Sequence, residues 1–260
     1  MSSISSAPTE RFTSRAALYH RYRPSYPPAV LELLREECAL EPDSVVADIG
    51  SGTGKLTELF LEFGSTVFSV EPNAAMREAA VSNYGGNPRF ISVEGAAENT
   101  SLPSQSVDLA AVGHSFHWFD PIAARREFGR ILRPVCIAAL IWNDRRDSST
   151  PFLTDYEALL QKYGTDYGAV NPKKAATDTA LIASFFGGED FDTAVFFNYQ
   201  DFDFEGLLGR VRSSSYTPAE GEEGWAAMTT ELLAIFQKHE SGGLVRFEYD
   251  TRVYFGSLKP

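Results

Sequence analysis

The stretch Val45-Val46-Ala47-Asp48-Ile49-Gly50-Ser51-Gly52-Thr53-Gly54-Lys55-Leu56 decides the fold of this chain. A short run rich in β-branched residues stops at an acid, passes through three alternate glycines and continues in a helical pattern. This order predicts a strand, a tight turn and the beginning of a helix, which is where α/β sheets hold nucleotide-like cofactors. Glycines suit the turn because side chains would block a ligand from the backbone, and because the turn needs unusual dihedral angles.

The spacing of these glycines excludes two common phosphate-binding turns. The dinucleotide-binding fingerprint places its third glycine three residues after the second, whereas Gly54 follows Gly52 after a single residue. A P-loop counted back from Gly54 and Lys55 would place its first glycine on Ile49 and its serine or threonine on Leu56. The turn is therefore expected to hold a nucleoside without a pyrophosphate.

Glu71 ends the next apolar run and supports this interpretation. A carboxylate at the end of the second strand can accept charge-assisted hydrogen bonds from both hydroxyl groups of a ribose. Asp48, at the end of the first strand, is expected to orient the glycine turn.

Composition limits the possible partners. The chain has 260 residues, 43% of them hydrophobic, and a net charge of −12, which argues against binding to a nucleic-acid backbone. Its two cysteines, Cys38 and Cys136, suggest a reducing compartment. No apolar run reaches a membrane-spanning length and the first residues do not form a secretion signal, so we expect a cytoplasmic protein without membrane contact.

Strand and helix patterns alternate along the first half of the chain, which predicts right-handed crossovers and a parallel sheet. Strand patterns occur at residues 45–49, 66–70, 89–93, 107–112, 137–142, 194–199 and 244–255. Helical patterns occur at residues 27–38, 55–63, 74–84, 122–132, 152–163, 179–186 and 225–239, and Pro134 is expected to stop the fourth of them. Residues 144–150 read as a polar loop.

The pattern also suggests how the chain is divided. Residues 1–14 are predicted to be a disordered tail, and residues 15–260 one domain. Two helical patterns without a strand between them predict a cap insertion at about residues 145–190. A further segment at about residues 200–240 is expected near the active site.

The glycine turn and four later segments together resemble the class I S-adenosylmethionine-dependent methyltransferases. The later segments are Glu71-Pro72-Asn73-Ala74-Ala75-Met76, Gly95-Ala96-Ala97-Glu98, Ile131-Leu132-Arg133-Pro134 and Ala139-Leu140-Ile141-Trp142. Two further segments, Tyr22-Arg23-Pro24-Ser25-Tyr26-Pro27-Pro28 and His114-Ser115-Phe116-His117-Trp118-Phe119-Asp120, are similar to the small-molecule branch related to trans-aconitate methyltransferase. Arg212-Ser213-Ser214-Ser215-Tyr216-Thr217-Pro218 and Tyr249-Asp250-Thr251 look like weaker matches to the same branch. The resemblance implies an α/β fold with a Rossmann-like, doubly wound, seven-stranded and mainly parallel sheet whose last strand is antiparallel, with a helical cap insertion.

The same resemblance implies a set of site residues. Contacts to S-adenosylmethionine would come from Tyr19, Arg23, Asp48, Gly50, Ser51, Gly52, Gly54, Glu71, Pro72, Ala96, Ala97, Glu98 and His114. The methyl acceptor would meet His117, Trp118, Trp142 and Arg145, with His117 as the general base and no metal ion. Arg146 is the alternative to Arg145 as the ligand of an acceptor carboxylate, and Met76 is interpreted as a core residue.

The chain departs from the family pattern at two places. Ala96 stands where an aspartate often meets the adenine amino group, so backbone groups near Ala97 and the Glu98 side chain would replace it. Val135 and Cys136 stand where the family has glycines after its Leu-Arg-Pro segment, so this turn must be built differently.

The resemblance predicts transfer of a methyl group from S-adenosylmethionine to a small molecule, through O-methylation of a carboxylate or a hydroxyl. A catalytically silent protein that binds the same cofactor remains an alternative. A nicotinamide-dependent oxidoreductase is the other alternative, although the glycine spacing speaks against it. The sequence leaves the acceptor and the oligomeric state open.

Overall fold

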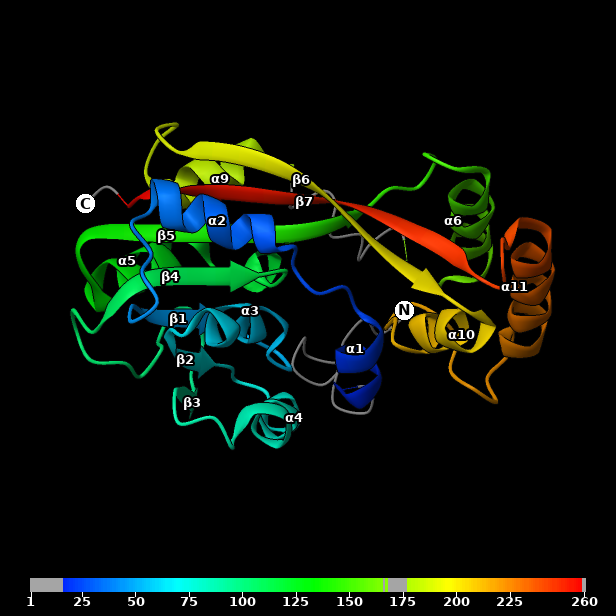
Figure 1. The fold of residues 1–260 in the computed structure, drawn as a ribbon, viewed down its shortest axis with the longest axis horizontal. Coiled ribbons are helices and arrows are strands. Elements are labelled where there is room, and N and C mark those ends of the chain that lie inside the picture. The colour runs from blue at the N-terminus through cyan, green and yellow to red at the C-terminus, as the bar shows by residue number, and fades with distance from the viewer. Residues whose placement is uncertain (1–15, 166, 168–176, 259–260) are drawn as a thin grey trace, which may run out of the picture.

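One sheet of seven strands organises the protein, in the order β3-β2-β1-β4-β5-β7-β6 (Figure 1). The computed structural model describes residues 16–165, 167 and 177–258, so the predicted tail at residues 1–14 lies outside the described part. The strands are β1 (Val45–Ile49), β2 (Thr66–Val70), β3 (Phe90–Val93), β4 (Val107–Gly113), β5 (Leu132–Arg145), β6 (Asp192–Phe202) and β7 (Val245–Ser257). Among the described strands, β7 runs in the direction opposite to the others and pairs antiparallel with β5 and β6. The remaining pairs are parallel, which confirms the predicted fold.

The strand order places the functional end of the sheet at β1 and β4. The chain leaves β1 towards β2 and β3 on one side and later returns on the other side as β4, so the turns after β1 and β4 diverge. Ligands of open α/β sheets bind in the crevice that such diverging turns leave at the carboxyl ends of the strands.

Helices cover both faces of the sheet because alternate residues of each strand point to opposite sides. On one face, α2 (Pro28–Glu37) and α3 (Lys55–Phe63) pack on a core that includes Val46 of β1. On the other face, α5 (Pro121–Ile131) and α9 (Thr179–Phe186) pack on a core that includes Ala47 and Ile49. The helix α4 (Ala74–Tyr84) lies beside β3.

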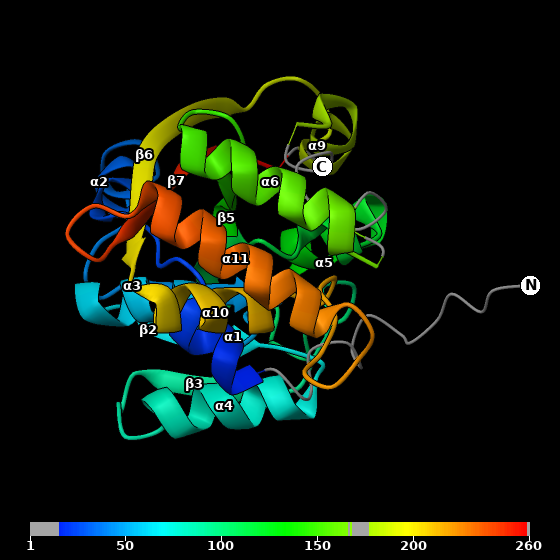
Figure 2. The same ribbon diagram turned by 90° about the vertical axis from the view of Figure 1, so that its right-hand side faces the viewer.

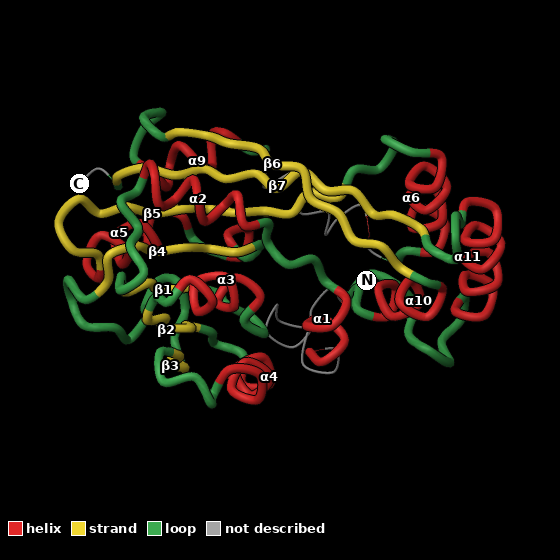
Figure 3. The backbone as a smooth tube through the Cα atoms, in the orientation of Figure 1, coloured by secondary structure: helices red, strands yellow, loops and turns green. Residues whose placement is uncertain are grey.

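A second group of helices lies beyond the ends of the short strands. It contains α1 (Ala16–Tyr22), α6 (Pro151–Tyr163), α10 (Phe204–Arg212) and α11 (Trp225–His239), which share one apolar core with the far ends of β6 and β7. Figure 2 looks at this end of the molecule and shows α6, α11, α10 and α1 one below another. The long strands β5, β6 and β7 join this group to the rest of the sheet (Figure 3). The helix α9, which the sequence grouped with α6, packs on α5 instead.

A glycine permits the close contact between α1 and α10. A Cβ atom on Gly209 would lie 2.2 Å from the ring of Tyr22, so only a residue without a side chain fits there. This contact connects the segment before α2 to the group of helices around α10.

Several predicted elements have the predicted bounds, namely the helices at residues 55–63, 74–84, 179–186 and 225–239. Two helices, α1 and α10, were missed; α10 has nine residues and contains Gly206 and Gly209, which have low helical propensity. The expected stop at Pro134 and the loop at residues 144–150 were partly wrong, because β5 begins at Leu132 and continues to Arg145. None of the described helices is both long and apolar enough to cross a membrane.

The long β5 strand contains an irregularity at Val135. Its pairing with β4 shifts register after Leu132, and Val135 has a φ of 96° with its side chain 71% exposed. This is the place where the sequence lacks the glycines of related proteins. A β-branched residue at positive φ is strained by about 1–3 kcal/mol.

We predict that Val135→Gly raises the free energy of unfolding by about 0.5–1 kcal/mol, since relief of this strain exceeds the larger chain entropy of glycine. Urea denaturation of the purified protein measures the change. The control is Val195→Gly, a valine on β6 that is 52% exposed and has no positive φ, which should destabilise the protein. An equal loss of stability in both variants would refute the strain at Val135.

Candidate functional site

A cavity of about 370 Å³ lies at the carboxyl ends of β1, β2 and β4, below the second group of helices. Its size falls within the range of roughly 300–1,000 Å³ that is typical of small-molecule sites. It is lined by most of the residues predicted from the sequence: Tyr19, Arg23, Gly50, Ser51, Gly52, Glu71, Pro72, Ala96, Ala97, Glu98, His114, His117, Trp118 and Arg145. Asp48, Gly54 and Trp142 do not line it.

Glu71 fixes the end of β2 to the glycine turn. Its two carboxylate oxygens accept hydrogen bonds of 2.9 Å each from the backbone N–H groups of Gly52 and Asn73. The side chain is only 8% exposed, and burial raises its pKa while these hydrogen bonds lower it. Each oxygen keeps a lone pair with which to accept a further hydrogen bond from a ligand in the cavity.

The glycine turn leaves open space for such a ligand. Gly50, Gly52 and Gly54 all have positive φ, in the region that favours glycine. A Cβ atom on Gly50 would lie 2.4 Å from Ser115 Oγ, whereas one on Gly52 would meet no atom within 4 Å. Close packing therefore explains the first glycine, and the open side of the turn lies at the second.

Asp48 supports the turn from behind. It is fully buried, and one carboxylate oxygen accepts a 2.6 Å hydrogen bond from Thr57 Oγ1 on α3. Burial raises the pKa of Asp48 to about 7. Its other oxygen has no hydrogen-bond partner, and the side chain acts by positioning α3.

The segment after β3 forms another wall. Ala96 and Asn99 pair through their backbones, which leaves Ala97 buried between them. The exposed Glu98 accepts a hydrogen bond from the backbone N–H of Asp120. The structure thus connects this segment to the start of α5.

Two neutral histidines line the cavity after β4. His114 has a φ of 61°, and its Nε2 lies 3.2 Å from the carbonyl oxygen of Asn143. Burial lowers the pKa of His117 to about 4, and burial with the nearby His117 and Arg23 lowers that of His114 to about 3. The ring of His117 packs on Trp118 with 4.7 Å between centroids.

Trp142 belongs to the hydrophobic core, so the predicted acceptor contact needs correction. Its fully buried ring packs edge-on against Phe116 and Tyr254. On β5 its side chain points to the sheet face covered by α5 and α9, while the next residue, Asn143, lines the cavity.

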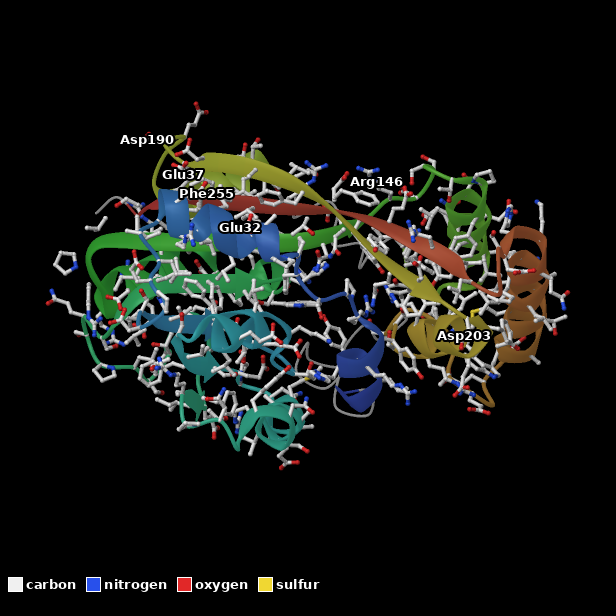
Figure 4. All side chains as sticks on the ribbon, in the orientation of Figure 1. Glu32, Glu37, Arg146, Asp190, Asp203 and Phe255 are labelled. Carbon is white, nitrogen blue, oxygen red and sulfur yellow. The ribbon has the colours of Figure 1, made fainter. Side chains whose placement is uncertain are left out.

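Arg145 reaches the cavity but already has a counter-charge. Its guanidinium donates to the carboxylate of Glu157 and, over 3.0 Å, to the hydroxyl of Tyr167. The alternative residue, Arg146, donates to Asp250 and lies outside the lining of the cavity (Figure 4). Both cations are thus paired within the protein.

Sequence reasoning missed several lining residues, among them Met76, Asn143, Arg210, Tyr216 and Tyr249. Met76 was interpreted as core, and it is indeed 5% exposed while its side chain borders the cavity. Tyr216 lay within a segment noted for its resemblance, which was the only available signal. Arg210 lies on α10, a helix that the sequence patterns did not reveal. Among the described residues no cluster of histidine, cysteine and carboxylate side chains could hold a metal ion.

We predict that the two histidines make the protein less stable in weak acid. The folded state keeps them neutral, whereas the unfolded chain takes up protons at the ordinary pKa of about 6.5, so their contribution is complete above that pH and lost as pH falls. Between pH 7 and pH 5, the free energy of unfolding of the wild type should fall by roughly 1–2 kcal/mol more than that of His117→Gln.

Variants must be compared with the wild type because Asp48 changes the free energy of unfolding in the opposite direction as pH falls. Its raised pKa means that the folded state takes up a proton first, which adds stability as pH falls from 7. Denaturation of the wild type, His117→Gln and His114→Asn at both pH values separates these contributions; asparagine tolerates the positive φ at residue 114. Identical pH dependence in all three proteins would contradict the prediction.

The chain is similar in sequence to a family of methyltransferase domains and to several uncharacterized methyltransferases. Residues 47–140 match the family model described as a methyltransferase domain. An uncharacterized methyltransferase of Schizosaccharomyces pombe is 27% identical over 253 residues, which cover 96% of this chain and 97% of that relative. An uncharacterized methyltransferase of Mycobacterium tuberculosis is 37% identical over 134 residues, and the match spans 52% of each protein.

A solved structure has the same fold across almost the whole chain. A proposed type II methyltransferase from Anaeromyxobacter dehalogenans superposes with a TM-score of 0.67 at 21% sequence identity, over 92% of this chain and 99% of that one. At this identity the likeness concerns the fold. The match to the methyltransferase-domain model is confined to residues 47–140.

Proposed function

We propose that this chain, which its fold and its methyltransferase-domain match support as a class I methyltransferase, transfers the methyl group of S-adenosylmethionine to a small molecule. The acceptor atom would be an oxygen of a carboxylate or a hydroxyl. The observation that carries the proposal is the position of Glu71, whose carboxylate lies beside the open side of the turn at Gly52. The glycine spacing, with Gly54 only two positions after Gly52, argues against a pyrophosphate at this turn.

The residues present fit the cofactor along the length of the cavity. Glu71 and Pro72 would hold the ribose, the backbone near Ala96 and Ala97 together with Glu98 would hold the adenine, and Gly50, Ser51 and Gly52 would lie along the nucleoside. Asp48 and Gly54 would act by shaping the turn, since neither borders the cavity.

The methionine part would lie against Tyr19, Arg23 and His114. The Arg23 guanidinium packs over the ring of Tyr19 at 5.1 Å, and its buried Nε has no hydrogen-bond partner. Burial and the nearby Arg210 lower the pKa of Arg23, so an anion at this place is favoured. The carboxylate of the methionine part supplies such an anion.

The chemistry of methyl transfer requires alignment more than proton transfer. When bound, the cofactor would supply a sulfonium methyl group, whose carbon an acceptor oxygen attacks in line while the carbon–sulfur bond breaks and the sulfur leaves as a neutral thioether. The protein would align the acceptor through Trp118 and Arg145 and exclude water beneath the second group of helices.

His117 would accept a proton only from a hydroxyl acceptor, because a carboxylate acceptor has none to lose. Its low pKa keeps the ring unprotonated at neutral pH but makes it a weak base. The proposed acceptor is a small molecule, not a nucleic acid or a membrane component. The proposed location is a reducing compartment such as the cytoplasm.

We predict that Glu71→Gln weakens binding of the demethylated cofactor by about 10–100-fold, since the substitution removes charge-assisted hydrogen bonds. The amide group would also direct its N–H toward one of the backbone N–H groups that Glu71 now accepts from. Isothermal titration with S-adenosylhomocysteine measures the change. The control is Glu94→Gln, an exposed carboxylate nearby that does not line the cavity.

Failure of the wild type to bind either S-adenosylmethionine or S-adenosylhomocysteine would refute the proposal. Binding without release of S-adenosylhomocysteine across a broad acceptor panel would instead favour a catalytically silent cofactor-binding protein. Binding of NADH in place of these ligands, followed by fluorescence, would favour an oxidoreductase.

A further inference from the structure

Arg210 is a buried cation without a counter-charge. It lies on α10, its side chain lines the cavity, and the residue is only 4% exposed. Its Nη1 donates a 3.0 Å hydrogen bond to Ser214 Oγ, and its buried Nε has no partner. No carboxylate of the described residues forms an ion pair with it, although an unpaired buried charge is costly.

The neighbours of Arg210 are aromatic and hydroxyl groups. Its guanidinium lies 6.0 Å from the ring centre of Phe247; burial lowers its pKa, but the nearby phenols of Tyr249, Tyr216 and Tyr156 outweigh this and raise it. By contrast, Arg145 in the same cavity is paired with Glu157. Arg210 therefore lines the cavity without a carboxylate partner among the described residues.

A second cation close by increases the imbalance. Arg23 Nη2 donates to the same Ser214 Oγ that Arg210 uses, at 3.4 Å, so two guanidinium groups meet at one hydroxyl. Like charges this close repel each other unless anions lie between or beside them.

The cofactor alone cannot balance both cations. S-adenosylmethionine carries one carboxylate, which Arg23 would bind, but also an ammonium and a sulfonium group. Once Arg23 binds that carboxylate, the cofactor has no second carboxylate to offer Arg210.

The pKa of Tyr216 also indicates a positive potential in this part of the cavity. Burial raises the pKa of a tyrosine, yet the charges of Arg210 and Arg23 outweigh this effect and lower the pKa of Tyr216 to about 8. The charged and titratable groups around it are Arg23, Arg145, Arg210, Tyr156, Tyr167 and Tyr249. Within the described part of the chain, this set contains cations and phenols, and the Glu157 carboxylate next to it is already bound by Arg145 and Tyr167.

We propose that Arg210, with Ser214 and Tyr216, binds a carboxylate of the methyl acceptor, so that the acceptor is a small carboxylic acid with a second oxygen group for methylation. The guanidinium withdraws electron density from the carboxylate that it binds, which makes those oxygens poor nucleophiles. The bound carboxylate is therefore an anchor, and the methylated oxygen belongs to another carboxylate or a hydroxyl of the same molecule. This inference rests on the proposed methyltransferase function.

The first experiment compares Arg210→Met and Arg210→Lys with the wild type on a panel of dicarboxylic acids, hydroxy acids, their monoesters, phosphorylated alcohols and neutral alcohols. We expect acids with two oxygen groups to be methylated and neutral alcohols not. Arg210→Met should raise the KM for the acid by about 10–100-fold, with a smaller change in kcat and an unchanged Kd for S-adenosylhomocysteine. Arg210→Lys should recover part of the loss. The control is Arg212→Met, on the same helix but outside the cavity lining and paired with Glu220.

Three outcomes would overturn the assignment. Loss of S-adenosylhomocysteine binding in Arg210→Met would place Arg210 at the cofactor carboxylate. An unchanged KM would deny it any role in acceptor binding, and a preference for phosphorylated or neutral alcohols would give the acceptor another chemistry. If the wild type binds no cofactor, the proposed function itself fails, which is a separate result.

A second readout needs no identified acceptor. Phenolate absorbance of the wild type, after subtraction of that of Tyr216→Phe, follows the ionisation of Tyr216 in protein saturated with S-adenosylhomocysteine. Succinate should raise the pKa of Tyr216, because an anion beside Arg210 cancels part of the charge that stabilises the phenolate. In Arg210→Met the pKa should already be higher and should not respond to succinate. A wild-type pKa that succinate leaves unchanged, or that inorganic phosphate raises and succinate does not, would overturn the carboxylate assignment.

Discussion

The hydrogen bonds that Glu71 accepts from the backbone N–H groups of Gly52 and Asn73 hold the functional end of this protein together. They connect the end of β2 to the turn after β1 and to the first residues before α4. Because one carboxylate accepts from both N–H groups, the turns after β1 and β2 keep a fixed separation. The cavity takes its shape from that separation, and the second group of helices covers it.

Behind this contact, side-chain hydrogen bonds from neighbouring segments stabilise the turn. Asp48 holds α3 through Thr57, and Ser115 Oγ donates to the carbonyl oxygen of Ile49 at the end of β1. Gly50 leaves the space that Ser115 occupies. The first glycine of the turn therefore serves packing, and the open side at Gly52 is the part that a ligand can approach.

Local signals made most of the first half of the fold predictable. Gly64, for example, ends α3 in the left-handed conformation, and Asn73 caps α4 by accepting a hydrogen bond from Met76 N–H. Such signals lie within a few residues of the element that they begin or end, so the sequence reveals them directly.

What the sequence could not predict depends on contacts between distant segments. Trp142 and Asn143 are adjacent on β5, and only the packing of α9 and α5 decides that the tryptophan points into the core. Arg145 and Arg210 are chemically alike, but Glu157 neutralises the first and no described carboxylate neutralises the second. Whether a charged side chain has a counter-charge depends on residues that only the fold brings close to it. In addition, the two glycines of α10, the helix that carries Arg210, hide its helical pattern in the sequence.

The ladder between β6 and β7 sets how this cavity can open. It pairs residues without interruption from Asp192 with Phe255 to Phe202 with Val245, so it passes through both the main sheet and the second group of helices. A rigid rotation of one half against the other would have to bend this continuous ribbon and strain its hydrogen bonds. The ladder therefore fixes the second group of helices relative to the main sheet, and with it the height of the cavity between them.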